Sequence, residues 1–324
     1  MVAKLILYSL LTQFNLHPHN VYVDTINEAY INPLARFHIE PVWIWLADSV
    51  QGEINNFRFI TFSIISILLF LIARSANVEL KYFSAYYTIF CLMNAVGLLR
   101  QPVAMCLSLW GMLLMCNKRY LLSIACLFFS CFFHKVGIIY VLLFPACLLP
   151  INRKLLWIYF LSLPLLYILF YIILNASSEL STVIFLQSYA QGDGEYASRH
   201  VIFKILSTIS TLSQFVFLIY TIYHFYESDD KYVKMLIRYI LATVIVSIFL
   251  FILPLSTGVF VKRLLYFAMM MMVIVWAKCI KGNLLQKRYI LMFVFLLIYI
   301  AIQLTGTFIQ NYTRIGERLL QMPW

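Results

Sequence analysis

Apolar segments long enough to cross a lipid bilayer recur from one end of this 324-residue chain to the other. Hydrophobic residues make up 63% of the chain and charged residues only 11%, whereas an ordinary soluble domain has about 25% charged residues. A helix that crosses a bilayer needs about 17–25 mostly apolar residues. The sequence therefore predicts an all-α, polytopic integral membrane protein embedded in a lipid bilayer.

We expect ten or eleven transmembrane helices in a single domain that comprises residues 1–324. The first segment is short and follows Lys4, which resembles a signal peptide, but no small-residue cleavage site precedes His17. We interpret it as an uncleaved helix. The expected segments are residues 3–16, 57–73, 80–99, 102–116, 120–133, 136–151, 155–174, 201–224, 235–255, 264–280 and 289–310.

The basic residues of the connections indicate how the chain is threaded, because cytoplasmic loops carry an excess of Lys and Arg. The basic set of alternate connections contains Arg74 and Lys81, Lys118 and Arg119, Arg153 and Lys154, Lys231 and Lys234, and Lys278, Lys281, Lys287 and Arg288. The other set contains residues 17–56, the gaps at Arg100 and His134, residues 175–200, residues 257–263 and the tail from Asn311. We expect the first set to be cytoplasmic and the second to face the periplasm or the cell exterior.

The net charge of +11 is distributed over short turns rather than a stripe or a tail. Topology explains it better than binding to nucleic acid, which we do not expect. The chain has no Walker A motif, no HExxH, no glycine-rich dinucleotide loop and no Asp-x-Asp pair. We therefore expect neither a metal nor an organic cofactor.

Rare charges in the outer gaps predict a polar site, because ionisable groups at such depth are costly to keep. Arg100 ends one apolar segment, Arg263 arrives at a similar level from the far end of the chain, and Arg199 is a third candidate. Converging guanidinium groups suit a phosphate or diphosphate, to which they donate paired hydrogen bonds. The alternative is that these side chains only extend toward the interface.

His134 lies in the second outer gap, followed by Lys135. An imidazole of ordinary pKa suits a general base that accepts a proton from a sugar hydroxyl, or a group that orients one. Alternatively, His134 only fixes a helix end. The carboxylate of Glu40 is a second candidate for the base.

The loop at residues 175–200 is polar and mildly acidic, and it includes Asp193 and Glu195. We predict that these two side chains, together with Gln101, contact sugar. Loops of this composition are also often simply solvated. Upstream, residues 38–50 have a proline at position 41 and tryptophans at positions 43 and 45, which predict a short interfacial helix with Glu40 at the membrane surface.

Several patches resemble the central block of EpsG-like and Wzy-type polysaccharide polymerases. The phrase LLRQPVAMCLSLWGMLL at residues 98–114 is followed by a basic turn and by CFFHKVGIIYVLLF at residues 131–144. The segment IEPVWIWLADSV at residues 39–50 resembles the early acidic and aromatic segment of the family, and KRLLYFAMM at residues 262–270 resembles its late arginine-rich helix start.

The resemblance implies a GT-C-like helical bundle in the bacterial inner membrane. It implies a glycosyltransferase that moves a growing glycan from undecaprenyl diphosphate onto a new lipid-linked repeat unit at the periplasmic face. Arg100 matches the central arginine, His134 the central histidine, Glu40 the early acidic position and Arg263 the late arginine. Lys135 stands where a small residue is expected, so we include it among the predicted diphosphate ligands.

Three other activities stay open at this stage. An O-antigen ligase uses the same donor, a flippase or other transporter moves lipid-linked oligosaccharides, and a membrane acyltransferase decorates polysaccharides. Ligases usually have a large basic outer loop, and transporters often have an internal repeat, neither of which this chain shows. The resemblance implies a chain-length regulator and a flippase as partners, whereas the sugars and the linkage formed are not predicted.

Overall fold

The computed structural model describes residues 40–51, 54–92, 100–134, 136–148, 201–252, 258–283 and 289–301, with a few single residues between them. All regular secondary structure in these ranges is helical, and they contain no strand, which confirms the all-α prediction. The helices are α3 (Pro41–Ser49), α4 (Ile54–Ser75), α5 (Leu80–Tyr87), the π-helix η3 (Thr88–Leu92), α7 (Arg100–Cys116), α8 (Tyr120–Phe133), α9 (Val136–Leu142), the 3₁₀-helix η4 (Phe144–Leu148), α13 (Val201–Phe225), α14 (Lys231–Ile252), α15 (Gly258–Cys279) and a helix at Ile290–Ala301.

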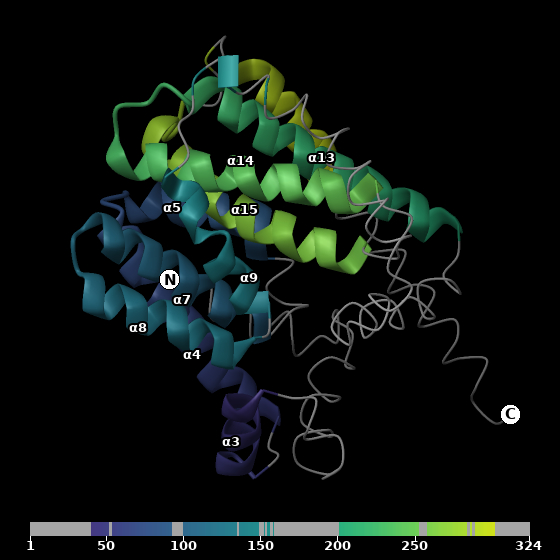
Figure 1. The fold of residues 1–324 in the computed structure, drawn as a ribbon. Coiled ribbons are helices and arrows are strands. Elements are labelled where there is room, and N and C mark those ends of the chain that lie inside the picture. The colour runs from purple at the N-terminus through teal and green to yellow at the C-terminus, as the bar shows by residue number, and fades with distance from the viewer. Residues whose placement is uncertain are drawn as a thin grey trace, which may run out of the picture. The chain divides into compact units, whose positions relative to one another are not determined.

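The chain divides into two compact units. The first comprises residues 1–145 and 276–282, and the second comprises residues 146–275 and 283–324. The helix α7 forms the centre of the first unit, packed between α4 and α8 (Figure 1). Most of its side chains are buried along its whole length. Arg100 and Gln101, at the start of this helix, are therefore attached to a well-packed element.

Small residues allow α7 and α8 to approach closely. The Ser123 hydroxyl donates to the Gly111 carbonyl oxygen at 2.7 Å. A Cβ atom on Gly111 would lie 3.1 Å from the Ser123 carbonyl oxygen and 3.1 Å from a Leu127 side-chain carbon. Helix pairs in membranes use small residues in this way, because dispersion contacts between close backbones replace the hydrophobic effect there.

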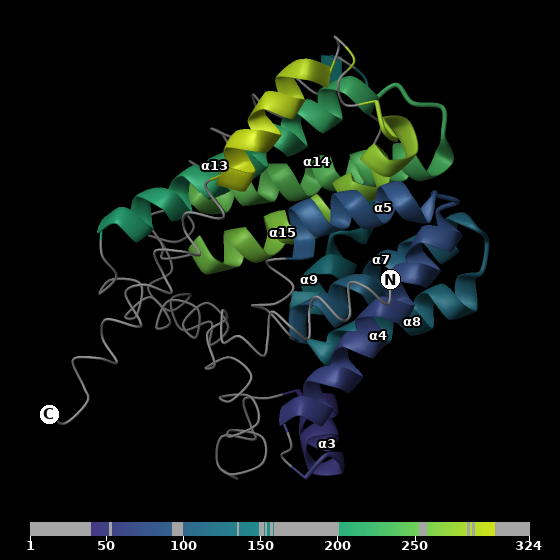
Figure 2. The same ribbon diagram turned by 180° about the vertical axis from the view of Figure 1, so that it is seen from behind.

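Three basic turns meet at one end of the first unit. The Asn117 amide and the Trp110 indole donate to Ser75, in the turn after α4. The Lys278 ammonium, from the end of α15, donates to the Ala76 carbonyl oxygen at 2.8 Å. α3 lies at the opposite end of α4 from these turns in both views (Figures 1 and 2), and the threading through the membrane stays a prediction. One end of the unit is basic, and the other holds Glu40.

The second unit contains α13, α14, most of α15 and the helix at Ile290–Ala301. The Phe217 ring on α13 packs edge to face on Tyr299, with the ring centroids 5.6 Å apart, and Figure 2 shows this last helix against α13. Tyr239 on α14 makes a similar contact with Phe267 on α15. The Arg238 guanidinium donates to the Cys147 carbonyl oxygen at 3.0 Å.

Within the described residues, one helix, Lys231–Leu250, is long and apolar enough by itself to cross a membrane, with a mean hydropathy of 2.1. Shorter apolar helices occur at Phe59–Ser75, Tyr120–Phe133 and Ile290–Ala301. The predicted count of ten or eleven spans is therefore not established by the helices alone. The predicted segments at residues 3–16 and 155–174 lie wholly or mostly outside the described residues.

Two predicted segments change helix type along their length, and one predicted turn is wrong. The segment predicted at residues 80–99 changes from α-helix to π-helix at Thr88. The segment predicted at 136–151 leaves the α-helix after Leu142, next to Pro145, which lacks the N–H that an α-helix requires. The turn predicted at residues 257–263 is helical from Gly258 onward, so Arg263 lies inside α15.

Candidate functional site

Glu40 lies directly before α3, at the position that caps a helix N-terminus. Pro41 starts the helix, as predicted, because its missing N–H has no partner to lose there. The side chains that usually accept a hydrogen bond from the first turn at this position are those of Ser, Thr, Asp and Asn. The Glu40 side chain makes no such bond. Its carboxylate is directed elsewhere.

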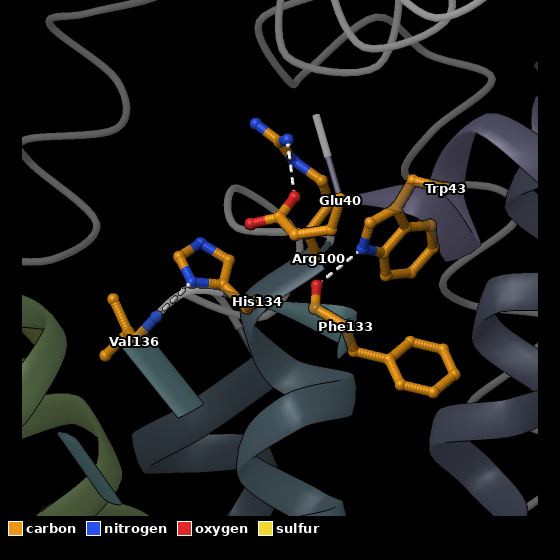
Figure 3. A network of polar contacts seen from close by, with 6 residues as sticks. All are labelled: Glu40, Trp43, Arg100, Phe133, His134 and Val136. Atoms are coloured by element: carbon orange, nitrogen blue, oxygen red, sulfur yellow. Dashed lines mark hydrogen bonds and ion pairs between the residues drawn. The ribbon is translucent and has the colours of Figure 1, made fainter. Parts of the chain in front are cut away.

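The partner of Glu40 is Arg100, the first residue of α7 (Figure 3). Arg100 Nη1 lies 3.0 Å from Glu40 Oε2, and the two side chains are 28% and 7% exposed. A cation at a helix N-terminus is unfavourable, because the peptide dipoles place partial positive charge there. The buried carboxylate offsets that charge. The structure thus brings together two residues that the sequence analysis selected independently.

His134 connects α8 to α9 and is 7% exposed. Its Nδ1 accepts a hydrogen bond from the Val136 backbone N–H at 3.1 Å. A neutral imidazole has one protonated nitrogen, so this bond places the proton on Nε2. In Figure 3, Nε2 points away from Val136 and toward the side of the Glu40 carboxylate. The bond to the Val136 N–H at the start of α9 agrees with the alternative interpretation, a histidine that fixes a helix end, whereas the base and orienting roles of His134 stay predictions.

The backbone around His134 is held by close packing of α8 on α9. The Gly137 N–H donates to the His134 carbonyl oxygen at 2.7 Å. A Cβ atom on Gly137 would lie 2.6 Å from the Ser130 carbonyl oxygen, which is closer than atoms can approach. Only glycine fits this position without a backbone shift. The direction of the imidazole is therefore set by its neighbours.

Trp43 links α3 to the end of α8. It is fully buried, and its indole Nε1 donates to the Phe133 carbonyl oxygen at 2.6 Å. Its ring packs on Phe57 and Phe133, whereas Trp45 is 68% exposed. The interfacial position of this segment stays a prediction. The sequence analysis did not predict this contact of Trp43, whose backbone N–H also donates to the Glu40 carbonyl oxygen at 2.9 Å.

Gln101 is 1% exposed, and its amide donates to the Tyr140 hydroxyl at 2.9 Å. Tyr140 is fully buried on α9. This bond joins the start of α7 to α9. In the sequence, Gln101 directly follows Arg100, and Tyr140 lies downstream of His134. The structure shows that Gln101 links two helices through a hydrogen bond. Its predicted contact with sugar stays a prediction.

The structure does not test whether the other predicted ligands belong to this site. Arg263 lies on α15 in the second unit and is half-buried. Lys135, Arg199, Asp193 and Glu195 lie outside the described residues. Among the residues that the structure describes, no three His, Cys, Asp or Glu side chains are grouped as metal ligands would be. The described site therefore consists of Glu40, Arg100 and His134 with their supports.

Comparison with known proteins finds one family. The sequence model described as "EpsG family" matches residues 5–318, which is nearly the whole chain. This match confirms the resemblance inferred from residues 98–114 and 131–144. No curated protein and no solved structure matches the chain.

Proposed function

The chain belongs to the EpsG family, and from this premise we propose that it is a polysaccharide polymerase of the bacterial inner membrane. It transfers a growing glycan from undecaprenyl diphosphate onto a new lipid-linked repeat unit. The observation that supports this activity most is the Arg100–Glu40 ion pair beside a buried histidine. It combines an anion-binding group and a carboxylate base in one place.

The basic turns of the first unit face the cytoplasm in this proposal, and the Arg100 end faces the periplasm. The helix α8 has 14 residues and α7 has 17, which correspond to lengths of about 21 and 25 Å at 1.5 Å per residue. The hydrocarbon core of a bilayer is about 30 Å thick. The site is thus recessed from the periplasmic surface, and irregular backbone at such depth is tolerated where it borders protein or water.

Arg100 binds the diphosphate of the donor lipid. Its guanidinium is partly exposed, whereas the carboxylate that it holds is almost fully buried. A diphosphate oxygen that approaches from the exposed side competes with Glu40 for the same N–H groups. Donor binding therefore releases the Glu40 carboxylate at the moment when a base is needed.

The reaction is a single displacement at the anomeric carbon. An acceptor hydroxyl oxygen forms the new bond to that carbon, and its proton passes to the Glu40 carboxylate. The bond from the anomeric carbon to the phosphate oxygen breaks, and its electron pair leaves with undecaprenyl diphosphate. Arg100 stabilises this leaving group, and the Nε2–H of His134 donates a hydrogen bond to an oxygen of either substrate. Much of the rate comes from alignment of two lipid-anchored reactants.

Residues beyond the described site complete the proposal. Arg263, Arg199 and Lys135 are additional diphosphate ligands, and Asp193 and Glu195 contact the sugar. The chemistry written above uses no metal and no organic cofactor. A chain-length regulator and a flippase are the proposed partner proteins.

The test is deletion of the gene, followed by electrophoresis of cell-surface polysaccharide. A polymerase is supported if the deletion strain makes only single repeat units and if the wild-type gene restores the ladder while Arg100→Ala does not. Loss of even the single unit indicates a ligase or a flippase instead. An unchanged ladder contradicts the proposal, provided that both proteins reach the membrane in equal amounts.

A further inference from the structure

One hydrogen bond connects the helix that follows Glu40 to the residue before His134. The Trp43 indole Nε1 donates to the Phe133 carbonyl oxygen at 2.6 Å across 90 positions of sequence. The ring also contacts the side chains of Phe57 and Phe133, with centroids 5.8 and 5.7 Å apart. Figure 3 shows this bond beside the ion pair.

The acceptor and the donor of this bond each require a hydrogen-bond partner. The Phe133 carbonyl ends α8, where the last carbonyl groups have no donor within the helix. The Gly137 N–H, which would be its partner in a continued helix, donates to the His134 carbonyl instead. A fully buried indole N–H without an acceptor is costly as well. The bond therefore fixes α3 at one place on the end of α8.

The position of α3 on α8 also determines where Glu40 of the ion pair lies. Glu40 directly precedes α3, and its carbonyl oxygen accepts a hydrogen bond from the Trp43 backbone N–H at 2.9 Å, so the position of Trp43 determines where the Glu40 backbone lies. The contacts between α3 and other helices are few and involve mainly α8. We infer that Trp43 is a positioning residue, whose indole N–H holds Glu40 against Arg100 and beside His134. This inference rests on the proposed function of that pair.

The rival explanation is that Trp43 only fills the core. Benzothienylalanine at position 43 distinguishes these two explanations, because sulfur replaces the N–H group while the shape of the ring is kept. Trp43→Phe is a second variant that also lacks the indole N–H. The matched control is Trp110→Phe, which removes an indole N–H bond to Ser75 at the opposite end of the same unit. All proteins are compared in nanodiscs at equal thermal stability or with the stability difference measured.

Two measurements decide between these explanations. Turnover of lipid-linked repeat units should fall by about ten- to a hundredfold in the Trp43 variants, because misplaced catalytic groups cost rates of that order. It should stay within about twofold in Trp110→Phe, since distant sites act independently. The apparent KM should change less than kcat. Equal effects in the Trp43 and Trp110 variants overturn the inference.

The second measurement does not require glycan transfer. Affinity for inorganic pyrophosphate should rise in the Trp43 variants, because a loosely held Glu40 competes less well for Arg100. In the Glu40→Gln background the same variants should cause no further change, since a residue that acts through Glu40 has nothing left to position. An additive effect in that background overturns the inference. If pyrophosphate binding behaves as expected while no glycan is transferred, the proposed function fails and the positioning role stands.

Discussion

Replacement of Glu40 by Gln should strengthen binding of a diphosphate while it abolishes turnover. The carboxylate occupies the guanidinium that the substrate needs, with Arg100 Nη1 3.0 Å from Glu40 Oε2. Exposed ion pairs contribute about 0.2–1 kcal/mol, and buried hydrogen bonds to charged groups contribute about 1.5–3 kcal/mol. Arg100 is 28% exposed and Glu40 is 7% exposed. We therefore expect the Arg100–Glu40 interaction to oppose diphosphate binding by about 1–2 kcal/mol, a value between those of exposed ion pairs and buried charged hydrogen bonds.

This free energy corresponds to about a 5–30-fold decrease in the dissociation constant of the diphosphate. The assay is isothermal titration calorimetry of the protein in nanodiscs, with inorganic pyrophosphate and farnesyl diphosphate as probes. Turnover of lipid-linked repeat units is measured in parallel and should be lost, because the amide of Gln cannot accept the acceptor proton. Arg100→Ala should lose both binding and turnover.

The control is Asp48→Asn, which removes one negative charge from the exposed end of the same helix. If tighter binding only reflected a more positive protein, Asp48→Asn would show a similar gain, which salt would screen. The reasoning is refuted if Glu40→Gln binds pyrophosphate no more tightly than the wild type. It is equally refuted if the Asp48 variant gains as much.

Three further predictions follow from the same unit. Gly137→Ala should lower the free energy of unfolding by about 1–3 kcal/mol or more, because its Cβ would lie 2.6 Å from the Ser130 carbonyl oxygen; an unchanged melting temperature would contradict the packing described. Tyr140→Phe should cost about 1–3 kcal/mol of stability, since it leaves a buried amide without its acceptor, and chemical denaturation measures this loss. In a cysteine-less background, Ser49→Cys should react with an impermeant maleimide in intact spheroplasts and Lys118→Cys only after lysis; the reverse pattern would invert the proposed topology.

The helical content of the first unit could be predicted well because polar turns separate its apolar segments. The range 120–133 agrees with α8 residue for residue, and 102–116 differs from α7 only at its start. Basic and polar residues mark both ends of these helices. The start of α15 was not predicted in this way, because Gly258 and the basic pair Lys262 and Arg263 are typical of a connection, whereas the helix begins at Gly258.

The candidate site could be predicted only as a set of isolated charges. Glu40, Arg100 and His134 were selected because ionisable groups are rare in this chain, and the structure places the first two in direct contact. Their relation could not be read from the sequence, since 60 positions separate Glu40 from Arg100. The proton position on His134 could not be predicted either, because it depends on the Val136 N–H and thus on how α8 ends.

Of the two charges, only Arg100 opposes the local preference of its helix. A guanidinium at the start of α7 opposes the helix dipole by about 0.3–1 kcal/mol, whereas Glu40, directly before α3, lies where a negative charge is favourable. Replacement of a buried ion pair by well-packed apolar groups is often neutral or stabilising. The pair is therefore weak evidence for a purely structural role. In the proposed function each charge is retained for a substrate that displaces the other.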